Sequence, residues 1–212
     1  MVINFFGRRG SGKTTTIKGQ LKDCRPPVVI VDVLGNFNNP EFIQVQDLRQ
    51  CILEIKKYHL AEKNGKTPPV KIINLKTSQT TTAADYLSAA IWEINGGTLI
   101  LDEVDSIKMT EGSCFDEYIR YGRNHSGDLL TGCRRPAELD RNITAAANKF
   151  YCFQTHEWRD IEYFSQVFGE NAEQLLNLPQ YSGLYLDYDV QEQGKFKIDI
   201  DGNIYHTETI RV

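Results

Sequence analysis

The feature that most constrains this chain is a glycine-rich segment close to its start, between an apolar run and a stretch with helical spacing. The segment is Gly7-Arg8-Arg9-Gly10-Ser11-Gly12-Lys13-Thr14, which matches the pattern G-x-x-x-x-G-K-[ST]. Glycines let the backbone curl around phosphate groups, and the amides at the start of a helix face their negative charge. The segment therefore predicts a nucleotide phosphate-binding loop between a strand and a helix.

Individual residues of this loop have separate expected roles. The Lys13 ammonium is placed to reach the β and γ phosphates, and the Thr14 hydroxyl is placed to bind Mg²⁺. The remaining contacts to the nucleotide are expected from the other loop residues and the first helical turn: Gly7, Arg8, Arg9, Gly10, Ser11, Gly12 and Thr15. The expected cofactors are ATP and Mg²⁺.

A second acidic motif ends a buried strand further along the chain. The run Gly97–Leu101 is followed by Asp102 and Glu103. Because ligands of open α/β sheets bind beyond the carboxyl ends of the strands, both carboxylates are expected at the nucleotide. We expect Asp102 to hold Mg²⁺ and Glu103 to activate the attacking water, while Asp105 is expected on the surface.

Apolar runs of strand length alternate with segments of helical spacing, which predicts an α/β fold with a mostly parallel central sheet flanked by helices. With the two motifs, this indicates a RecA-like P-loop NTPase. The expected strands are Val2–Phe6, Val28–Val33, Lys71–Leu75, Thr98–Asp102, Asp128–Thr131 and Phe150–Gln154. The expected helices cover residues 12–22, 47–59, 83–95, 111–123, 136–146 and 158–168.

Beyond Pro179 the pattern changes to alternation with a period of two, in Gly183–Asp189, Gly194–Asp199 and Asn203–Thr209. Asp201-Gly202 lies between the last two runs and is a strong hairpin signal. We expect a small C-terminal antiparallel β appendage. The chain is predicted to form one ATPase domain over residues 1–212, with a RecA-like core in 1–180 and C-terminal strands in 181–212.

Composition and charge limit the classes of function. A formal net charge of −4 argues against a protein that coats nucleic acid by bulk attraction, although a motor can grip a few phosphates with loops. The cysteines number 5, an odd count without C-x-x-C spacing, so a zinc ribbon or a disulfide framework is not indicated. The apolar runs are too short for a membrane span and no signal peptide opens the chain, so a cytoplasmic protein is expected.

Other classes of P-loop protein fit the sequence less well. Asp32-Val33-Leu34-Gly35 matches the D-x-x-G pattern of GTPases, yet no N-K-x-D motif for reading guanine is present. A small-molecule kinase is a further alternative, but such kinases usually carry an arginine-bearing lid. A strand that ends in Asp102 and Glu103 instead favours an ATP-hydrolysing motor.

The segment Arg123–Pro136 is the most selective part of the sequence. An arginine precedes a glycine turn, a strand and an Arg-Pro pair, and this arrangement resembles the FtsK–HerA superfamily of DNA-pumping ATPases. Asn148–Gln154 and Gly183–Leu186 are similar to later strands of that superfamily. The short chain without further domains looks most like the genome-packaging ATPases of membrane-containing icosahedral viruses.

The resemblance implies roles for several arginines. Arg123 would be the arginine finger that reaches the nucleotide of a neighbouring subunit, with Arg120 as its competitor for that role. Relatives often carry Gln before Arg-Pro as a sensor of the γ-phosphate, whereas this chain has Arg134 there. The sensor role is therefore open between Arg134 and Arg135. His125, next to the finger, is expected as an exposed loop histidine.

The resemblance also implies partners and a setting. It implies a homo-oligomeric ring, with six subunits as the expected number, that moves double-stranded DNA and meets capsid or membrane-vertex proteins in the host cytoplasm or the virion. Lys108 is the first candidate for a DNA contact. The alternatives are a phage assembly and export ATPase of the zonula-occludens-toxin-like type and a nucleotide-gated scaffold that does not turn ATP over.

Overall fold

The computed structural model describes residues 1–66, 68 and 71–211. These residues form two compact units, each with its own strands and helices. Among the described residues, the first unit contains Met1 and those from Asp23 to Leu130, and the second contains Val2–Lys22 and those from Thr131 to Arg211. The phosphate-binding loop belongs to the second unit, whereas Asp102 and Glu103 belong to the first.

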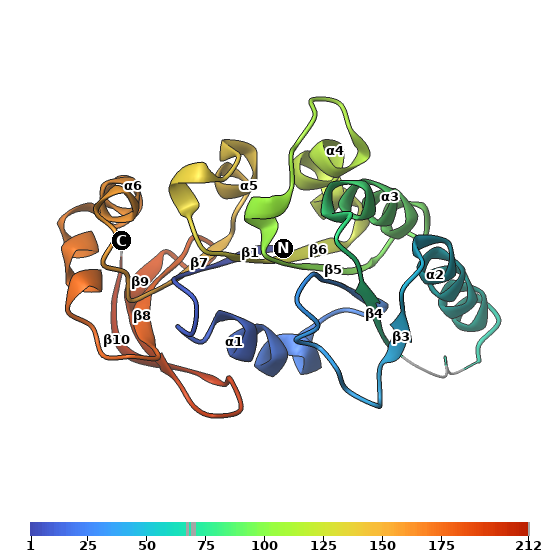
Figure 1. Ribbon diagram of the computed structural model, residues 1–212, viewed down its shortest axis with the longest axis horizontal. Helices are drawn as coiled ribbons and strands as arrows, with labels where there is room; N and C mark the ends of the chain where they lie inside the picture. Colours follow the sequence, from blue (N-terminus) through green and yellow to red (C-terminus); the bar gives the residue numbers. More distant parts are fainter. Residues whose placement is uncertain (67, 69–70, 212) are drawn as a thin grey trace. The chain divides into compact units, whose positions relative to one another are not determined.

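The first unit is a sheet covered by helices. Its strand order is β6–β5–β2–β4–β3, and β2 pairs in parallel with both β4 and β5, as β3 does with β4. The helices α2, α3 and α4 lie on one face of these strands (Figure 1). The elements are β2 (Val28–Asp32), β3 (Ile43–Val45), α2 (Leu48–Lys63), β4 (Ile72–Lys76), α3 (Thr80–Glu93), β5 (Gly97–Asp102), η2 (Val104–Ser106), α4 (Cys114–Tyr121), η3 (Gly122–His125) and the start of β6 (Gly127–Cys133).

The second unit combines parallel and antiparallel strands. Its order is β10–β9–β8–β7–β1–β6, in which β1 and β7 are parallel and the pairs from β7 to β10 are antiparallel. α1 lies on one face, and α5 and α6 lie on the other (Figure 1). The elements are β1 (Val2–Phe6), α1 (Lys13–Gln20), η1 (Leu21–Asp23), η4 (Pro136–Glu138), α5 (Arg141–Ala145), β7 (Lys149–Phe153), α6 (Trp158–Phe168), η5 (Gly169–Leu176), β8 (Ser182–Asp187), β9 (Glu192–Ile198) and β10 (Ile204–Arg211).

The burial of the central strands explains why their sequences are continuous apolar runs. Every residue of β2 and β5 is buried, as expected for parallel strands whose two faces are both covered. In the second unit, aromatic rings pack against one another in the buried core. Phe6 packs edge-on against Phe164 with ring centroids 5.5 Å apart, and Phe153 packs in the same way against Phe196 at 5.0 Å.

The predicted fold class is confirmed, since mostly parallel strands are flanked by helices and followed by C-terminal antiparallel strands. Several predicted helices are wrong in extent, including α3, which begins at Thr80 and not at residue 83. The helix expected over 136–146 is broken, because Leu139 is extended and the Asp140 carboxylate caps a new helix by accepting the amide of Asn142. The helix expected from residue 111 begins only at Cys114, because Ser113 is its N-cap.

Other boundaries differ where local periodicity carried little information. The short strand β3 and the 3₁₀ segment η5 were not expected, and α2 continues to Lys63, beyond its expected end. Across the described part of the chain, no helix combines the length and the apolar character that a membrane crossing requires.

Candidate nucleotide-binding site

The phosphate-binding loop joins β1 to α1 in the second unit, as its sequence predicts. Gly12, directly before α1, has φ +111°, a value that residues with a Cβ rarely adopt. A Cβ at Gly12 would lie 2.6 Å from Cδ1 of Ile198, and one at Gly7 would lie 2.6 Å from Oγ of Ser11. The glycines are therefore required both by the backbone conformation and by the close approach of neighbouring side chains.

Lys13 lies at the start of α1 and is almost fully buried. Its ammonium donates to the carbonyl oxygens of Gly7 at 2.6 Å and Arg8 at 3.1 Å, and so lies across the curl of the loop. Arg8 itself is exposed and donates to Oε1 of Gln154 at 3.4 Å, and Arg9 is also exposed. The loop thus holds the lysine ammonium inside its curve and turns its two arginines outward.

Ser11 and Thr16 are buried hydroxyl residues beside the loop, and they differ in their bonding. The Thr16 hydroxyl donates to the carbonyl of Gly12 at 2.9 Å. Ser11 is 4% exposed, and its hydroxyl has no hydrogen-bond partner among the described residues. A buried hydroxyl without a partner is costly, which indicates that a polar ligand such as a phosphate oxygen fits here.

The donor chemistry of two predicted metal ligands also fits Mg²⁺. Thr14 is a half-buried hydroxyl on the first turn of α1, and Asp102 is a buried carboxylate at the end of β5. Hydroxyl and carboxylate oxygens are the hard ligands that Mg²⁺ prefers. Thr15, the last predicted contact of the loop, is half-buried on the same helical turn as Thr14.

Arg134 and Arg135 follow β6 in the second unit, and both are exposed. Arg135 donates to Glu138 at 2.9 Å, and this hydrogen bond raises the pKa of its guanidinium. Nearby, Asp160 is buried and accepts from the Thr155 hydroxyl at 3.2 Å, while burial raises the pKa of its carboxyl. Asp160 was not singled out from the sequence, since a helical aspartate gives no local signal of burial.

Glu103 has an unusual backbone in the first unit. Its φ is +73° and its ψ is +50°, the left-handed region that a residue with a long side chain rarely adopts. The carbonyl of Glu103 accepts from the amide and the hydroxyl of Ser106, and the oxygen of this hydroxyl lies 3.1 Å from the Thr80 hydroxyl oxygen. Strained residues persist where the surroundings hold them and are common at active sites, so this observation supports a functional Glu103. Asp105, expected on the surface, is half-buried.

The D-x-x-G segment has a structural role. Asp32, at the end of β2, is fully buried and pairs in register with Asp102 of β5. Its carboxylate accepts the amides of Gly35, Asn36 and Phe37 at 2.8–2.9 Å and so builds a tight turn. The Asn36 side chain then donates to Asp102 at 3.5 Å. No local pattern singled out Asn36, because its partner lies on another strand.

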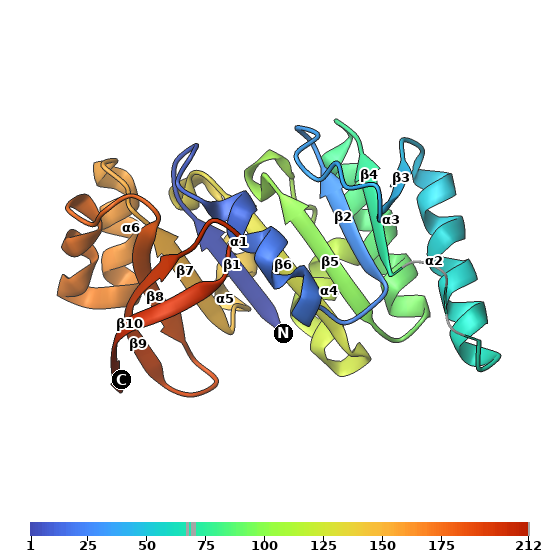
Figure 2. The ribbon, with the colours of Figure 1, turned by 90° about the horizontal axis from the view of Figure 1, so that it is seen from below.

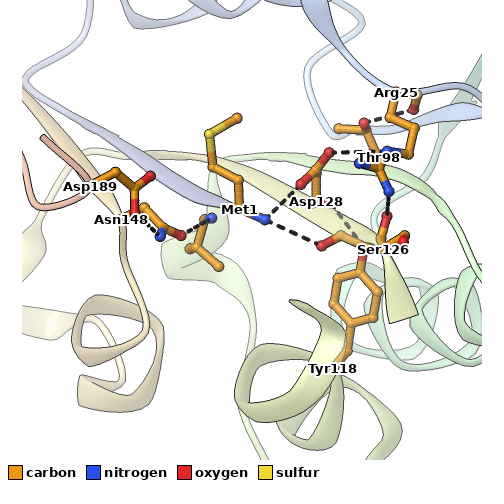
Figure 3. Close-up of polar contacts among 10 residues, drawn as sticks. Met1, Arg25, Thr98, Tyr118, Ser126, Asp128, Asn148 and Asp189 are labelled. Carbon is orange, nitrogen blue, oxygen red and sulfur yellow. Dashed lines mark hydrogen bonds and ion pairs between the residues drawn. The ribbon is translucent and has the colours of Figure 1, made fainter. Parts of the chain in front are cut away.

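The segment that carries Arg123 is fixed from several sides. The ring of His125 stacks on Trp92 with centroids 3.9 Å apart, so the expectation of an exposed histidine is wrong. Arg25 donates to the carbonyl of Ser126 at 2.9 Å, and the Met1 ammonium contacts the carboxylate of Asp128 at 2.6 Å (Figure 3). The backbone of Arg123 lies in η3, while its side chain is outside the described part of the structure.

Arg120, the competitor for the finger role, lies on α4 and makes an ion pair within its own helix. Its Nε is 2.9 Å from Oδ1 of the buried Asp116, and this hydrogen bond raises the pKa of the guanidinium. The other carboxylate oxygen of Asp116 accepts the amide of Gly112 at 3.0 Å. Arg120 therefore has a local structural role. Lys108, in the loop after η2, is exposed.

Solved structures of viral packaging proteins share this fold. The genome packaging NTPase B204 from Sulfolobus turreted icosahedral virus 2, in complex with AMPPCP, matches with a TM-score of 0.72 at 18% identity, over 92% of this chain and 95% of that chain. Its complex with ATP-gammaS has a TM-score of 0.70 at 18% identity, with the same coverage of 92% and 95%. B204, the DNA-packaging ATPase from Sulfolobus Turreted Icosahedral Virus, matches with a TM-score of 0.61 at 18% identity, again over 92% and 95%.

No protein-family model matches the sequence, and no curated protein sequence matches it either. The resemblance inferred from Arg123–Pro136 is thus confirmed as a likeness of fold to packaging ATPases.

Proposed function

We propose that this chain hydrolyses ATP with Mg²⁺ in a ring of identical subunits and uses the energy to move double-stranded DNA into a viral particle. The observation that carries the proposal is the loop from Gly7 to Thr14, with its buried Lys13 and its unpartnered buried Ser11 hydroxyl. The likeness of fold to B204, whose structures contain ATP analogues, supports ATP as the nucleotide.

The chemistry divides between the two motifs. The loop amides and the Lys13 ammonium bind the β and γ phosphates and stabilise the charge that develops on the transferred phosphoryl group. Thr14 and Asp102 would hold Mg²⁺, which would supply further neutralisation of phosphate charge. Glu103 orients the attacking water and accepts its proton, and its strained backbone is consistent with a fixed side-chain direction.

The arginines complete the proposed site. Arg123 acts in trans as the finger on the nucleotide of a neighbouring subunit, and a finger of this kind contributes roughly 10³–10⁵ in rate. The ion pair of Arg120 with Asp116 favours Arg123 for this role. Arg135 is assigned as the γ-phosphate sensor, with the exposed Arg134 as the alternative.

The remaining partners follow from the proposed motor. Double-stranded DNA passes through the ring, Lys108 contacts its phosphates, and capsid or membrane-vertex proteins dock the ring in the host cytoplasm or on the virion. The rivals are an export ATPase of the zonula-occludens-toxin-like type, a small-molecule kinase and a nucleotide-gated scaffold.

The decisive experiment measures ATP hydrolysis against protein concentration, with and without linear double-stranded DNA. Glu103→Gln removes the base, Arg123→Ala removes the finger, and the exposed Glu111→Gln is the matched control for the glutamate. Arg120→Ala tests the competing arginine in the same assay. A parallel sample with EDTA tests the requirement for Mg²⁺.

We expect specific activity to rise with protein concentration and with DNA. Activity should fall about 10²–10⁴-fold in Glu103→Gln and about 10³–10⁵-fold in Arg123→Ala, and remain near wild type in Glu111→Gln. Specific activity that does not depend on protein concentration or on DNA, and that is retained in Arg123→Ala, would refute the ring motor and favour the kinase. Nucleotide binding without any turnover would favour the scaffold.

A further inference from the structure

An exposed tyrosine from the C-terminal part of the chain lies against the phosphate-binding loop. A Cβ at Gly12 would lie 3.3 Å from Cδ1 of Tyr181 and 3.3 Å from Cε1 of Phe153. Phe153 is fully buried, whereas Tyr181 is 47% exposed. Of these two rings beside Gly12, only Tyr181 therefore offers accessible surface to a ligand.

The backbone of Tyr181 is held in an unfavourable conformation. Its φ is +63°, in the left-handed region, although tyrosine is bulky. Its carbonyl accepts the amide of Ile198 at 3.0 Å, and the next amide, that of Ser182, donates to the carbonyl of Pro179 at 3.1 Å. Hydrogen bonds on both sides thus fix the direction in which the ring leaves the backbone.

The hairpin that supports Tyr181 is itself fixed to α1. A Cβ at Gly19 of α1 would lie 2.5 Å from the carbonyl oxygen of Gly202 in the β9–β10 turn, so the two backbones touch. Lys22 also donates to the side chain of Asn203 at 2.8 Å. The turn and α1 lie on the same side of the strands of this unit (Figure 2). The hairpin that binds the backbone of Tyr181 is therefore also attached to the C-terminal end of α1.

We propose that Tyr181 stacks on the base of the bound nucleotide, with Ile198 as the apolar side chain beside it. This inference rests on the proposed function, because it presumes that the loop binds the phosphates of ATP. A nucleotide anchored by its phosphates at Gly12 must place its base on a neighbouring surface, and an exposed aromatic face suits a flat base. Every nucleobase has a flat π-face that can stack on a tyrosine ring. Binding at Tyr181 therefore depends on the area of the stacked rings and not on hydrogen bonds to a particular base.

The test separates the base from the phosphates. Binding of ATP and of inorganic tripolyphosphate, both with Mg²⁺, is measured by calorimetry for wild type, Tyr181→Ala and Tyr181→Phe. Tyr188→Ala is the matched control, because Tyr188 is similarly exposed at 53% but lies beyond the opposite end of β8. Thermal unfolding without ligand reports whether each variant is folded.

We expect Tyr181→Ala to weaken ATP binding about ten-fold, within the range of about five-fold to over a hundred-fold for one base–aromatic stack. Its affinity for tripolyphosphate should be unchanged, and Tyr181→Phe and Tyr188→Ala should bind both ligands like wild type. Unchanged ATP binding in Tyr181→Ala, or an equal loss of affinity for ATP and for tripolyphosphate, would overturn the stacking role of Tyr181 and leave the proposed nucleotide site standing. A wild-type protein that binds neither ligand would overturn the inference together with the proposed nucleotide site.

Discussion

Replacing Asp32 by alanine tests whether the buried carboxylate at the end of β2 builds the loop beside Asp102. Asp32 is fully buried, and its carboxylate accepts four hydrogen bonds, from the amides of Gly35, Asn36 and Phe37 and from the side chain of Asn74. The alanine variant keeps the strand but removes the acceptor for all four donors.

The expected loss of unfolding free energy follows from the surroundings of each donor. The amide of Phe37 is buried and would lose the Asp32 carboxylate as its acceptor, at a cost of about 1–3 kcal/mol of unfolding free energy. The amides of Gly35 and Asn36 are partly buried and can be rehydrated, so each loses about 0.5–1.5 kcal/mol. The side chain of Asn74 keeps Phe37 and Gln44 as acceptors, so its lost bond to Asp32 adds little to the loss of unfolding free energy. The total is about 2–6 kcal/mol.

The assay is urea-induced unfolding followed by tryptophan fluorescence and circular dichroism. Asp199→Ala is the control, since Asp199 also accepts four hydrogen bonds, but its carboxylate is open to solvent and its donors can be rehydrated. We expect Asp32→Ala to lose clearly more unfolding free energy than Asp199→Ala. A loss below about 1 kcal/mol for Asp32→Ala, or equal losses in both variants, would refute the reasoning.

Three further predictions concern the loop, the hairpin and the segment before β6. Gly12→Ala should weaken tripolyphosphate binding at least about ten-fold in calorimetry, because left-handed strain of about 1–2 kcal/mol adds to the contact with the C-terminal hairpin; unchanged binding would contradict this. Hydrogen bonds, first from Asn203 and then from Tyr205, lower the pKa of Asp199 to about 2. Their contribution to the free energy of unfolding is therefore complete above the unfolded pKa of about 3.9 and is lost as the pH falls through about 2. Wild type should therefore lose its advantage in melting temperature over Asp199→Asn between about pH 4 and pH 2, and a constant difference would count against the assignment. His125→Ala should lower the unfolding free energy by about 1 kcal/mol in urea titrations, since its stacked ring contact is removed, and no change would argue against the stack.

The sequence predicted those parts of the site that are local. The glycine loop, Lys13 and Thr14 follow one strand and open one helix, so a contiguous pattern specifies their chemistry and their placement together. The strand ending in Asp102 was predictable for the same reason, because a buried parallel strand is a continuous apolar run. The alternation beyond Pro179 likewise indicated the antiparallel strands.

Helix ends and side-chain networks were less predictable. Caps such as Ser113 and Asp140 decide where α4 and α5 begin, and they compete with periodicity that alone favoured longer helices. The D-x-x-G pattern at Asp32 matched the switch pattern of GTPases, although the sequence as a whole argued against a GTPase. The structure shows what these residues do instead: the Asp32 carboxylate accepts the backbone amides of a tight turn.

Only the tertiary structure decided which distant residues meet. Tyr181 lies against Gly12 because the C-terminal hairpin is fixed to α1, and Asn36 reaches Asp102 because β2 and β5 pair in register. Neither contact has a signal in local composition or period. The sequence by itself determined which chemistry the chain can present, since that depends on residue types within one motif. The pairing of strands determined which other side chains surround that chemistry.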